Sequence, residues 1–252
     1  MSKIISVRDL CKTYKLKGYE NEVLRNINFD MEDGEFVSIM GPSGSGKSTM
    51  LYTVSGMDNM TSGTVNFASR EISTLSNKEL SKVRLTEMGF IFQQMYMLRK
   101  LCVFDNIVLP GYQAGTPRNA VNDRAVELMR NLGIEDIAQR EIGEVSGGQL
   151  QRACICRALI NSPKVLFADE PTGALNSKAS NEVMQEIRKI NNRGTGVMMV
   201  THSVRVAAQS DRVIYLVDGN IKGDVTLGRL ESEEDIVPRD QWLNGWLMNQ
   251  GW

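Results

Sequence analysis

One short run of residues, Gly41–Ser48, restricts the fold of this chain more than any other part of the sequence. It reads GPSGSGKS and fits the pattern GxxxxGK[ST] at every fixed position, between an apolar stretch ending at Met40 and a helix-favouring stretch beginning at Lys47. Glycines let the backbone aim successive N–H groups at a phosphate chain, and the following helix adds the positive end of its dipole. A strand, a glycine-rich turn and a helix in this order predict a phosphate-binding loop in an α/β domain.

Polar residues of this loop have expected partners on a bound nucleotide. Lys47 can reach the β- and γ-phosphates, where it would serve both binding and catalysis, and the Ser48 hydroxyl can ligate Mg²⁺. A chance match to the pattern is expected in roughly one chain in a hundred of this length, so the flanking strand and helix carry much of the inference. We expect the nucleotide to contact Gly41, Pro42, Ser43, Gly44, Ser45, Gly46, Lys47, Ser48 and Thr49.

Charge and hydropathy exclude some other classes of protein. The 252 residues include 29 Lys and Arg against 30 Asp and Glu, a net charge of -1, which argues against nucleic-acid binding. No apolar run approaches the roughly 18 to 20 residues that cross a bilayer. The charged N-terminal sequence lacks the apolar core of a signal peptide. These features predict a chain that stays in the cytoplasm.

The cysteines fit a reducing compartment. The chain has Cys11, Cys102, Cys154 and Cys156, which form no CxxC pair, and it has a single histidine, so zinc has little support. We expect four reduced, mostly buried thiols.

Apolar periodicity indicates how the chain is organised. Ile4–Val7 and Val23–Phe29 alternate apolar and polar residues, which predicts short antiparallel strands. Short apolar runs that alternate with helical patterns predict a parallel sheet covered on both faces. These runs are Glu35–Met40, Met88–Phe92, Val165–Ala168, Val197–Val200 and Val213–Val217. We therefore expect one α/β domain over residues 1–228, with an N-terminal antiparallel β subdomain and a helical subdomain inserted over about 95–160.

Two acidic residues follow one of these predicted strands. Val165–Ala168 runs directly into Asp169 and Glu170. In enzymes with this phosphate loop, a strand-end aspartate supports Mg²⁺, and a carboxylate one residue later could accept the proton of the attacking water. An acidic pair alone is more often a solvated turn, but a phosphate loop on the same sheet reverses those odds.

Gln93 and His202 end two further predicted strands. Each would be an ordinary structural or surface residue if it stood alone. Because α/β sheets bind ligands at the carboxyl ends of their strands, we expect His202 to contact the γ-phosphate or to hold the water with Glu170. The Gln93 side-chain oxygen can complete the ligands of Mg²⁺ together with Ser48 and Asp169.

The segment Val145–Arg152 reads VSGGQLQR and resembles the LSGGQ signature of the ABC ATPases, with Val145 in place of the usual leucine. The resemblance covers about residues 3 to 228 and implies a P-loop NTPase fold with a RecA-like parallel core and hydrolysis of ATP with Mg²⁺. In that family two copies pack head to tail around two ATP molecules. The resemblance implies that the γ-phosphate of ATP on one copy is capped by the partner's equivalents of Ser146, Gly147, Gly148 and Gln149.

Other positions match further elements of the family. Tyr14 matches the aromatic residue that stacks on adenine, Gln93 the loop that senses Mg²⁺ and touches a transmembrane partner, and His202 the switch histidine. Ala174–Asn176 matches the loop after the second acid, where the family usually has aspartate at the position of Asn176. Asparagine keeps the hydrogen-bonding capacity but loses the charge, so the resemblance predicts hydrolysis with altered communication between the two ATP sites.

A finer resemblance concerns the subgroup. Leu75–Leu80, Met88–Gln94 and Asn106–Pro110 resemble the lipoprotein-releasing and macrolide-exporter branch, and Glu170–Ser177 resembles the Bce-type subgroup. Bce-type ATPases power a membrane permease that confers resistance to peptide antibiotics such as bacitracin and lantibiotics, and the permease often signals through a histidine kinase. The resemblance implies a homodimeric ATPase at the cytoplasmic face of the membrane with a separate integral membrane permease.

Three alternatives remain beside this interpretation. The ATPase could instead serve a lipoprotein-releasing or macrolide-type exporter. It could also be a soluble ABC ATPase outside transport, although such proteins usually carry a coiled-coil insertion or two fused ATPase units, which this chain lacks. A regulatory protein that binds ATP without hydrolysis is opposed by the presence of Lys47, Asp169, Glu170 and His202.

Residues 229–252 form a tail that contains all three tryptophans, Trp242, Trp246 and Trp252. Trp242, Leu243, Trp246 and Leu247 could form one apolar helical face. The tail is expected either to pack against its own domain or to contact the permease or the membrane surface.

Overall fold

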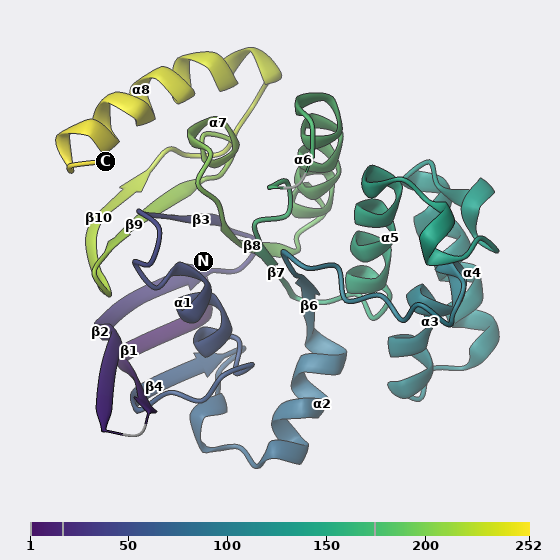
Figure 1. Cartoon of the computed structure of the whole chain (residues 1–252), viewed down its shortest axis with the longest axis horizontal. Helices are drawn as coiled ribbons and strands as arrows, with labels where there is room; N and C mark the ends of the chain where they lie inside the picture. The colour runs from purple at the N-terminus through teal and green to yellow at the C-terminus, as the bar shows by residue number, and fades with distance from the viewer. Residues whose placement is uncertain (1, 17, 174) are drawn as a thin grey trace. The chain divides into compact units, whose positions relative to one another are not determined.

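The computed structural model describes residues 2–16, 18–173 and 175–252, and the chain divides into two compact units (Figure 1). The first unit comprises Met1–Leu80 and Gly196–Trp252, and the second comprises Ser81–Thr195. One of the two boundaries falls within the helix α2 (Asn77–Glu87). Buried apolar side chains form a core in each unit.

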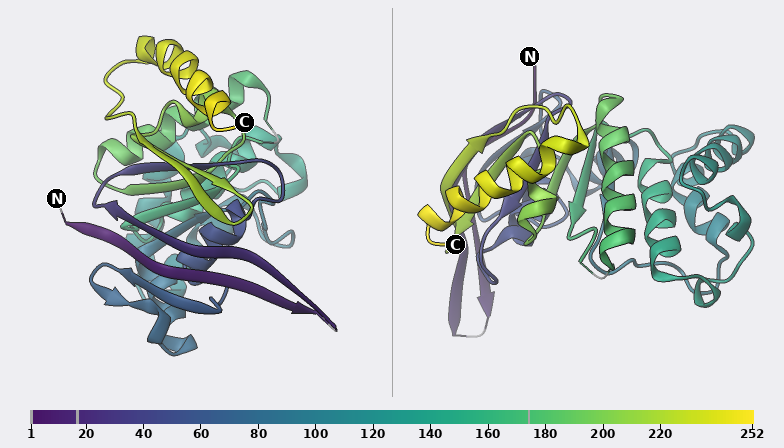
Figure 2. Two further views of the ribbon diagram at one scale, coloured as in Figure 1. Left: turned by 90° about the vertical axis from the view of Figure 1, so that its left-hand side faces the viewer. Right: turned by 90° about the horizontal axis from the view of Figure 1, so that it is seen from above.

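The first unit contains the predicted antiparallel sheet, in the order β2-β1-β4-β5. Its strands are β1 (Lys3–Leu16), β2 (Tyr19–Glu32), β4 (Ser62–Phe67) and β5 (Arg70–Glu71), followed by the 3₁₀ helix η1 (Ile72–Thr74). The sequence pattern predicted the first two as short strands, but each has 14 residues and they pair as a long hairpin (Figure 2). The extra length lies where polar and charged residues interrupt the alternation, so apolar periodicity could not detect it.

Parallel strands of the same unit carry the phosphate loop. β3 (Phe36–Met40) lies between β8 (Gly196–Val200) and β9 (Arg212–Val217) and runs parallel to both. Every residue of β3 and β8 is buried, as continuous apolar runs predict. The remaining elements here are α1 (Lys47–Val54), α7 (Val204–Ala207) and β10 (Asn220–Thr226), which is antiparallel to β9.

The second unit joins a parallel strand pair to helices. β6 (Met88–Ile91) pairs with β7 (Val165–Asp169). The helices are α3 (Val103–Gln113), α4 (Arg118–Asn131), α5 (Gly147–Leu159) and α6 (Ser177–Asn192), with the 3₁₀ helices η2 (Glu135–Ile137) and η3 (Ile142–Glu144). α5 contacts α3, α4, α6 and β6 and is therefore the centre of this unit.

The cysteines are all free, but only two of them are buried. Cys154 and Cys156 lie inside α5, where burial raises the pKa of Cys154 to about 11 and raises that of Cys156 further. Cys11 and Cys102 are half-buried, so the expectation of mostly buried thiols holds only for the two cysteines in α5.

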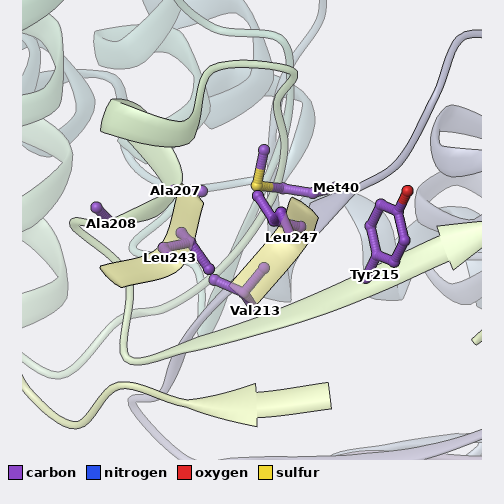
Figure 3. Packing of buried hydrophobic residues seen from close by; sticks show 7 residues of the cluster. All are labelled: Met40, Ala207, Ala208, Val213, Tyr215, Leu243 and Leu247. Carbon is purple, nitrogen blue, oxygen red and sulfur yellow. The ribbon is translucent and has the colours of Figure 1, made fainter. Parts of the chain in front are cut away.

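The tail forms η4 (Glu233–Asp235) and α8 (Ile236–Asn249), and it packs on its own unit. Leu243 and Leu247 are fully buried, and α8 contacts α7 (Figures 2 and 3). The other buried members of this cluster are Met40, Ala207, Ala208, Val213 and Tyr215. Packing against its own domain is thus the interpretation that the structure favours.

The three tryptophans do not behave alike. Trp246 and Trp252 meet the ring of Tyr215 edge-on, with centroid separations of 6.4 and 6.0 Å. A Cβ added at Gly223 would lie 2.6 Å from the Trp246 ring, so a side chain there would force the ring to shift. Trp242 is 53% exposed, which corrects the prediction that it shares an apolar face with Leu243 and its neighbours.

Within the described residues, no helix combines the length and the apolar character that a membrane span requires.

Candidate functional site

The predicted phosphate-binding turn joins β3 to α1. Its glycines Gly41, Gly44 and Gly46 have φ values of 156°, 81° and 99°. A Cβ at Gly41 would lie 2.0 Å from the carbonyl oxygen of Leu216, and one at Gly46 would lie 2.9 Å from that of Val23. Glycine is required at both positions because the backbone is left-handed and a neighbouring carbonyl fills the space of a side chain.

The Lys47 side chain is tied to this turn. Its Nζ donates hydrogen bonds to the carbonyl oxygens of Gly41 (2.9 Å) and Pro42 (2.8 Å). The residue is buried, although the turn itself is exposed at Pro42, Ser43 and Gly44. The ammonium group therefore stands at the turn, where it could exchange carbonyl partners for phosphate oxygens.

His202 lies at the same sheet edge as the turn. β3 and β8 are parallel, and Ile39 pairs with Val200. Gly41 and His202 each follow their paired residue by two positions, so both leave the sheet at its carboxyl edge. His202 is exposed, and the next residue, Ser203, caps α7 through its Oγ. The parallel register thus brings these predicted site residues to one edge.

Tyr14, near the end of β1, belongs to a small polar cluster that sequence reasoning missed in part. The Tyr14 hydroxyl donates to Oδ2 of Asp58 at 2.6 Å, and Lys12 Nζ donates to Oδ1 of the same carboxylate at 2.8 Å. Lys12 and Tyr14 are two residues apart, the spacing of one strand face. That spacing was a usable signal for Lys12, whereas no local pattern indicates Asp58.

The two predicted acids end β7 in the second unit. Asp169 is 3% exposed, and Glu170 follows with φ 47°, a left-handed conformation that is uncommon for a residue with a side chain. The Gly173 N–H donates to the Glu170 carbonyl at 3.1 Å, and a Cβ at Gly173 would lie 3.0 Å from Glu170 Oε2. The turn after β7 therefore holds Glu170 in a defined and costly backbone conformation.

Gln93 leaves the second unit's strand pair at the same edge as Glu170. β6 and β7 are parallel, and Ile91 pairs with Ala168. Gln93 and Glu170 each lie two residues beyond that pair, and Gln93 is exposed. Phe90 and Phe167 stack between these strands with centroids 5.5 Å apart, which supports the register.

The SGGQ segment opens α5 through a capping box. Ser146 Oγ accepts from the Gln149 N–H at 3.3 Å, and Gln149 Oε1 accepts from the Ser146 N–H at 3.0 Å. Gly147 and Gly148 stand in the first turn of the helix. Their N–H groups lie at the positive end of the helix dipole, which suits an anion.

Asn176, the departure from the usual aspartate, caps α6. Its Oδ1 accepts from the Ala179 N–H at 2.9 Å. Asparagine and aspartate cap helices about equally well, so the substitution keeps this structural contact. Ala174, expected in the same loop, lies outside the described residues.

A family match connects these elements to known proteins. The family described as ABC transporter matches residues 24–173, which contain the glycine-rich turn, the SGGQ segment and the Asp169–Glu170 pair. The chain belongs to the ABC transporter ATP-binding family.

Two relatives illustrate the range of this family. The chain is 39% identical over 218 residues to the uncharacterized ABC transporter ATP-binding protein YknY of Bacillus subtilis, covering 86% of this chain and 95% of YknY. It is 41% identical over 247 residues to the macrolide export ATP-binding/permease protein MacB of Shigella sonnei, covering 98% of this chain. The chain spans 38% of the length of MacB.

Solved ABC cassettes share the fold. A dimeric, post-hydrolysis structure of the ATP-binding cassette MJ0796 with ADP and Pi matches with a TM-score of 0.84 and 37% identity, over 90% of this chain and 100% of that chain. A second dimeric MJ0796 structure matches with the same TM-score and 38% identity. The predicted P-loop NTPase fold and the predicted ATPase activity are thus confirmed. As a member of this family, the present chain binds ATP.

The predicted site residues of the ABC ATPase are distributed over the two units. The phosphate loop, Tyr14 and His202 belong to the first unit. Gln93, Ser146–Gln149, Asp169, Glu170 and Asn176 belong to the second.

Proposed function

We propose that this ABC ATPase works as a homodimer around two MgATP molecules and powers an integral membrane permease from the cytoplasmic side. The observation that carries the proposal is the glycine pair of α5. A Cβ at Gly147 would meet no described atom within 4 Å, and one at Gly148 would meet only the Ala179 Cβ, at 3.6 Å. The packing within the chain does not need glycine at these two positions. Glycine does, however, allow another molecule to approach the backbone at the start of the helix closely.

The proposal gives each residue a role in the ATP site. The turn from Gly41 to Thr49 holds the phosphates, Tyr14 stacks on adenine, and Ser146–Gln149 of a second copy cap the γ-phosphate. The dimeric MJ0796 structure with ADP and Pi supports the dimeric, nucleotide-binding part of this proposal. We assign residues 1–228 to the ATPase domain, with a helical subdomain over about 95–160, and residues 229–252 to an appended segment.

Magnesium fits the proposed donor set. Ser48 offers a hydroxyl, Gln93 a carboxamide oxygen and Asp169 a carboxylate, and hard oxygen donors are what Mg²⁺ prefers. Asp169 is buried at the end of β7, and its carboxylate would be the anionic ligand of the set. Bound Mg²⁺ would neutralise charge that develops on the phosphates.

Glu170 is the proposed general base, and His202 holds the γ-phosphate or the water beside it. ATP drives closure only through its stronger affinity for the closed dimer, because a ligand shifts an equilibrium by its differential affinity alone. The proposed capping by Ser146–Gln149 supplies that difference, since it forms only on closure. Catalysis then consists mainly of positioning and electrostatic stabilisation. Asn176 in the adjoining loop is proposed to alter communication between the two ATP sites.

The central test uses Glu170→Gln with a matched control. We expect ATPase activity to fall by about 100-fold or more, the usual worth of a general base, while a nucleotide-bound dimer accumulates on size exclusion. Glu127→Gln, an exposed carboxylate on α4, controls for loss of charge and keeps its activity. Wild-type turnover in Glu170→Gln would contradict the proposed base.

Lys47→Ala should weaken ATP binding roughly 10- to 100-fold, as expected for lost charge-assisted hydrogen bonds.

For the cargo, we propose resistance to cell-wall-targeting peptide antibiotics, because the segment Glu170–Ser177 resembles the Bce-type subgroup. In that case the permease also signals to a histidine kinase. The similarity to MacB over 98% of this chain favours a second candidate, a macrolide-type exporter. Expression with the permease, followed by susceptibility tests against bacitracin and against a macrolide, separates the candidates. Resistance to the macrolide alone would refute the peptide assignment.

A further inference from the structure

The Lys12–Asp58–Tyr14 cluster is built more strongly than an ordinary surface contact. Lys12 is only 7% exposed, and its Nζ donates both to Asp58 and to the Asn59 carbonyl oxygen. The same ammonium stands 4.5 Å from the centroid of the Tyr14 ring. A nearly buried lysine needs such pairing, because an unpaired buried charge costs several kcal/mol.

At neutral pH, the protonation states of Asp58 and Tyr14 favour the hydrogen bond between the two side chains. Burial raises the pKa of Asp58, but hydrogen bonds from Lys12 and Tyr14 outweigh it, so the net pKa lies below the ordinary value. Burial, together with the Asp58 hydrogen bond, raises the pKa of Tyr14. The carboxylate therefore accepts and the phenol donates, a charge-assisted bond that is stronger than a neutral one.

The helix of the phosphate loop places Asp58. The N–H groups of Met57 and Asp58 both donate to the Tyr52 carbonyl oxygen, at 2.8 and 3.1 Å, just after α1. α1 begins at Lys47, so one element holds the phosphate-binding lysine at its start and Asp58 beyond its end. The ring of Tyr14 is thereby tied to the same helix while 39% of its surface stays exposed.

We propose that Asp58, held by Lys12, is a positioning residue that orients the Tyr14 ring for the adenine of ATP and links it to the phosphate-loop helix. This inference rests on the proposed adenine-stacking role of Tyr14. Asp58 acts through the tyrosine ring and raises affinity for the base. It contributes nothing to the affinity of the phosphates.

The test compares MgATP with inorganic tripolyphosphate, which offers phosphates without a base. Tyr14→Phe keeps the ring but removes the hydroxyl's hydrogen bonds to Asp58 and Thr49. Calorimetric titration of Asp58→Asn and of Tyr14→Phe should show ATP affinity reduced by a similar factor. We expect roughly ten-fold, within the range of base–aromatic stacking. Tripolyphosphate affinity should stay unchanged in both. In Asp58→Asn, turnover at saturating ATP should stay near wild type while the KM for ATP rises.

A double variant shows whether Asp58 works through the ring. Tyr14→Ala combined with Asp58→Asn should bind ATP no more weakly than Tyr14→Ala alone, since coupled residues are not additive. Asp30→Asn is the matched control: it removes the charge of an aspartate in the sheet that carries Tyr14, which pairs with Lys3 and Arg8, and it should leave both affinities unchanged. Additive losses would overturn the inference.

Other outcomes distinguish a failure of the positioning role of Asp58 from a failure of the proposed function. Equal loss of ATP and tripolyphosphate binding in Asp58→Asn, or no loss of ATP binding in Tyr14→Phe, would refute the positioning role. Wild-type ATP affinity in Tyr14→Ala would refute both the stacking role and this inference while leaving phosphate binding intact. A wild-type chain that binds neither ligand would refute the proposed function itself.

Discussion

Two glycine-rich segments each open a helix in this chain: Gly41–Gly46 precedes α1, and Ser146–Gly148 forms the N-cap and first residues of α5. In the first, a Cβ at Gly41 would lie 2.0 Å from a backbone oxygen, on a left-handed backbone. In the second, a Cβ at Gly147 would have no neighbour within 4 Å in the part of the chain that the structure describes. Glycine is thus needed for folding at the first turn, whereas the packing of the described residues around the second turn does not require it.

The largest effect on stability is expected for Gly41→Ala. Left-handed strain and overpacking against the Leu216 carbonyl should together cost about 3 kcal/mol or more. For a chain of this size that lowers the melting temperature by roughly 6 to 12 °C. Thermal unfolding without nucleotide measures it. A change below about 2 °C would mean that the turn relaxes more easily than its glycines imply.

Gly147→Ala should reverse this behaviour. Stability should stay constant or rise by up to about 1 kcal/mol, because alanine favours a helix over glycine. ATPase activity should nevertheless fall strongly if the N–H groups of α5 must approach a phosphate. Gly245→Ala in α8, likewise with open space around its Cβ among the described residues, is the control and should keep full activity. Full activity in Gly147→Ala would erase the distinction between the two turns.

A moderate loss of stability is expected for Ser146→Ala. Removal of the hydroxyl leaves the Gln149 N–H without its capping partner and should cost about 1 kcal/mol. Chemical denaturation measures this cost. Ser146 would then be needed for the stability of α5, whereas the neighbouring Gly147 would not. An unchanged free energy of unfolding would show that water replaces the cap.

The smallest change in stability is expected for Asn176→Asp. Both residues cap α6 through a side-chain oxygen, so the free energy of unfolding should change by less than about 0.5 kcal/mol. The cooperativity of ATP hydrolysis, measured against ATP concentration, should change instead, because the loop gains a charge. A stability change without any change in cooperativity would assign position 176 to folding alone.

Strict local patterns explain what the sequence could predict. The phosphate turn has fixed spacing, and β3 and β8 are continuous apolar runs, so their positions followed directly. β10 was missed because Gly223 interrupts the apolar alternation between Ile221 and Val225. The Lys12–Asp58 pair was missed because 46 residues separate its members, and no periodic pattern reports contacts at that distance.

The left-handed backbone of Glu170 has a consequence for how this protein could change under selection. A glycine there would adopt the same conformation without strain and should make the folded chain more stable by about 1 kcal/mol. Because Glu170 is also the proposed general base, a screen for heat tolerance alone would enrich Glu170→Gly chains that, under that proposal, no longer hydrolyse ATP. The proposed role would thus oppose stability and turnover at this one position, through the backbone conformation of a single residue.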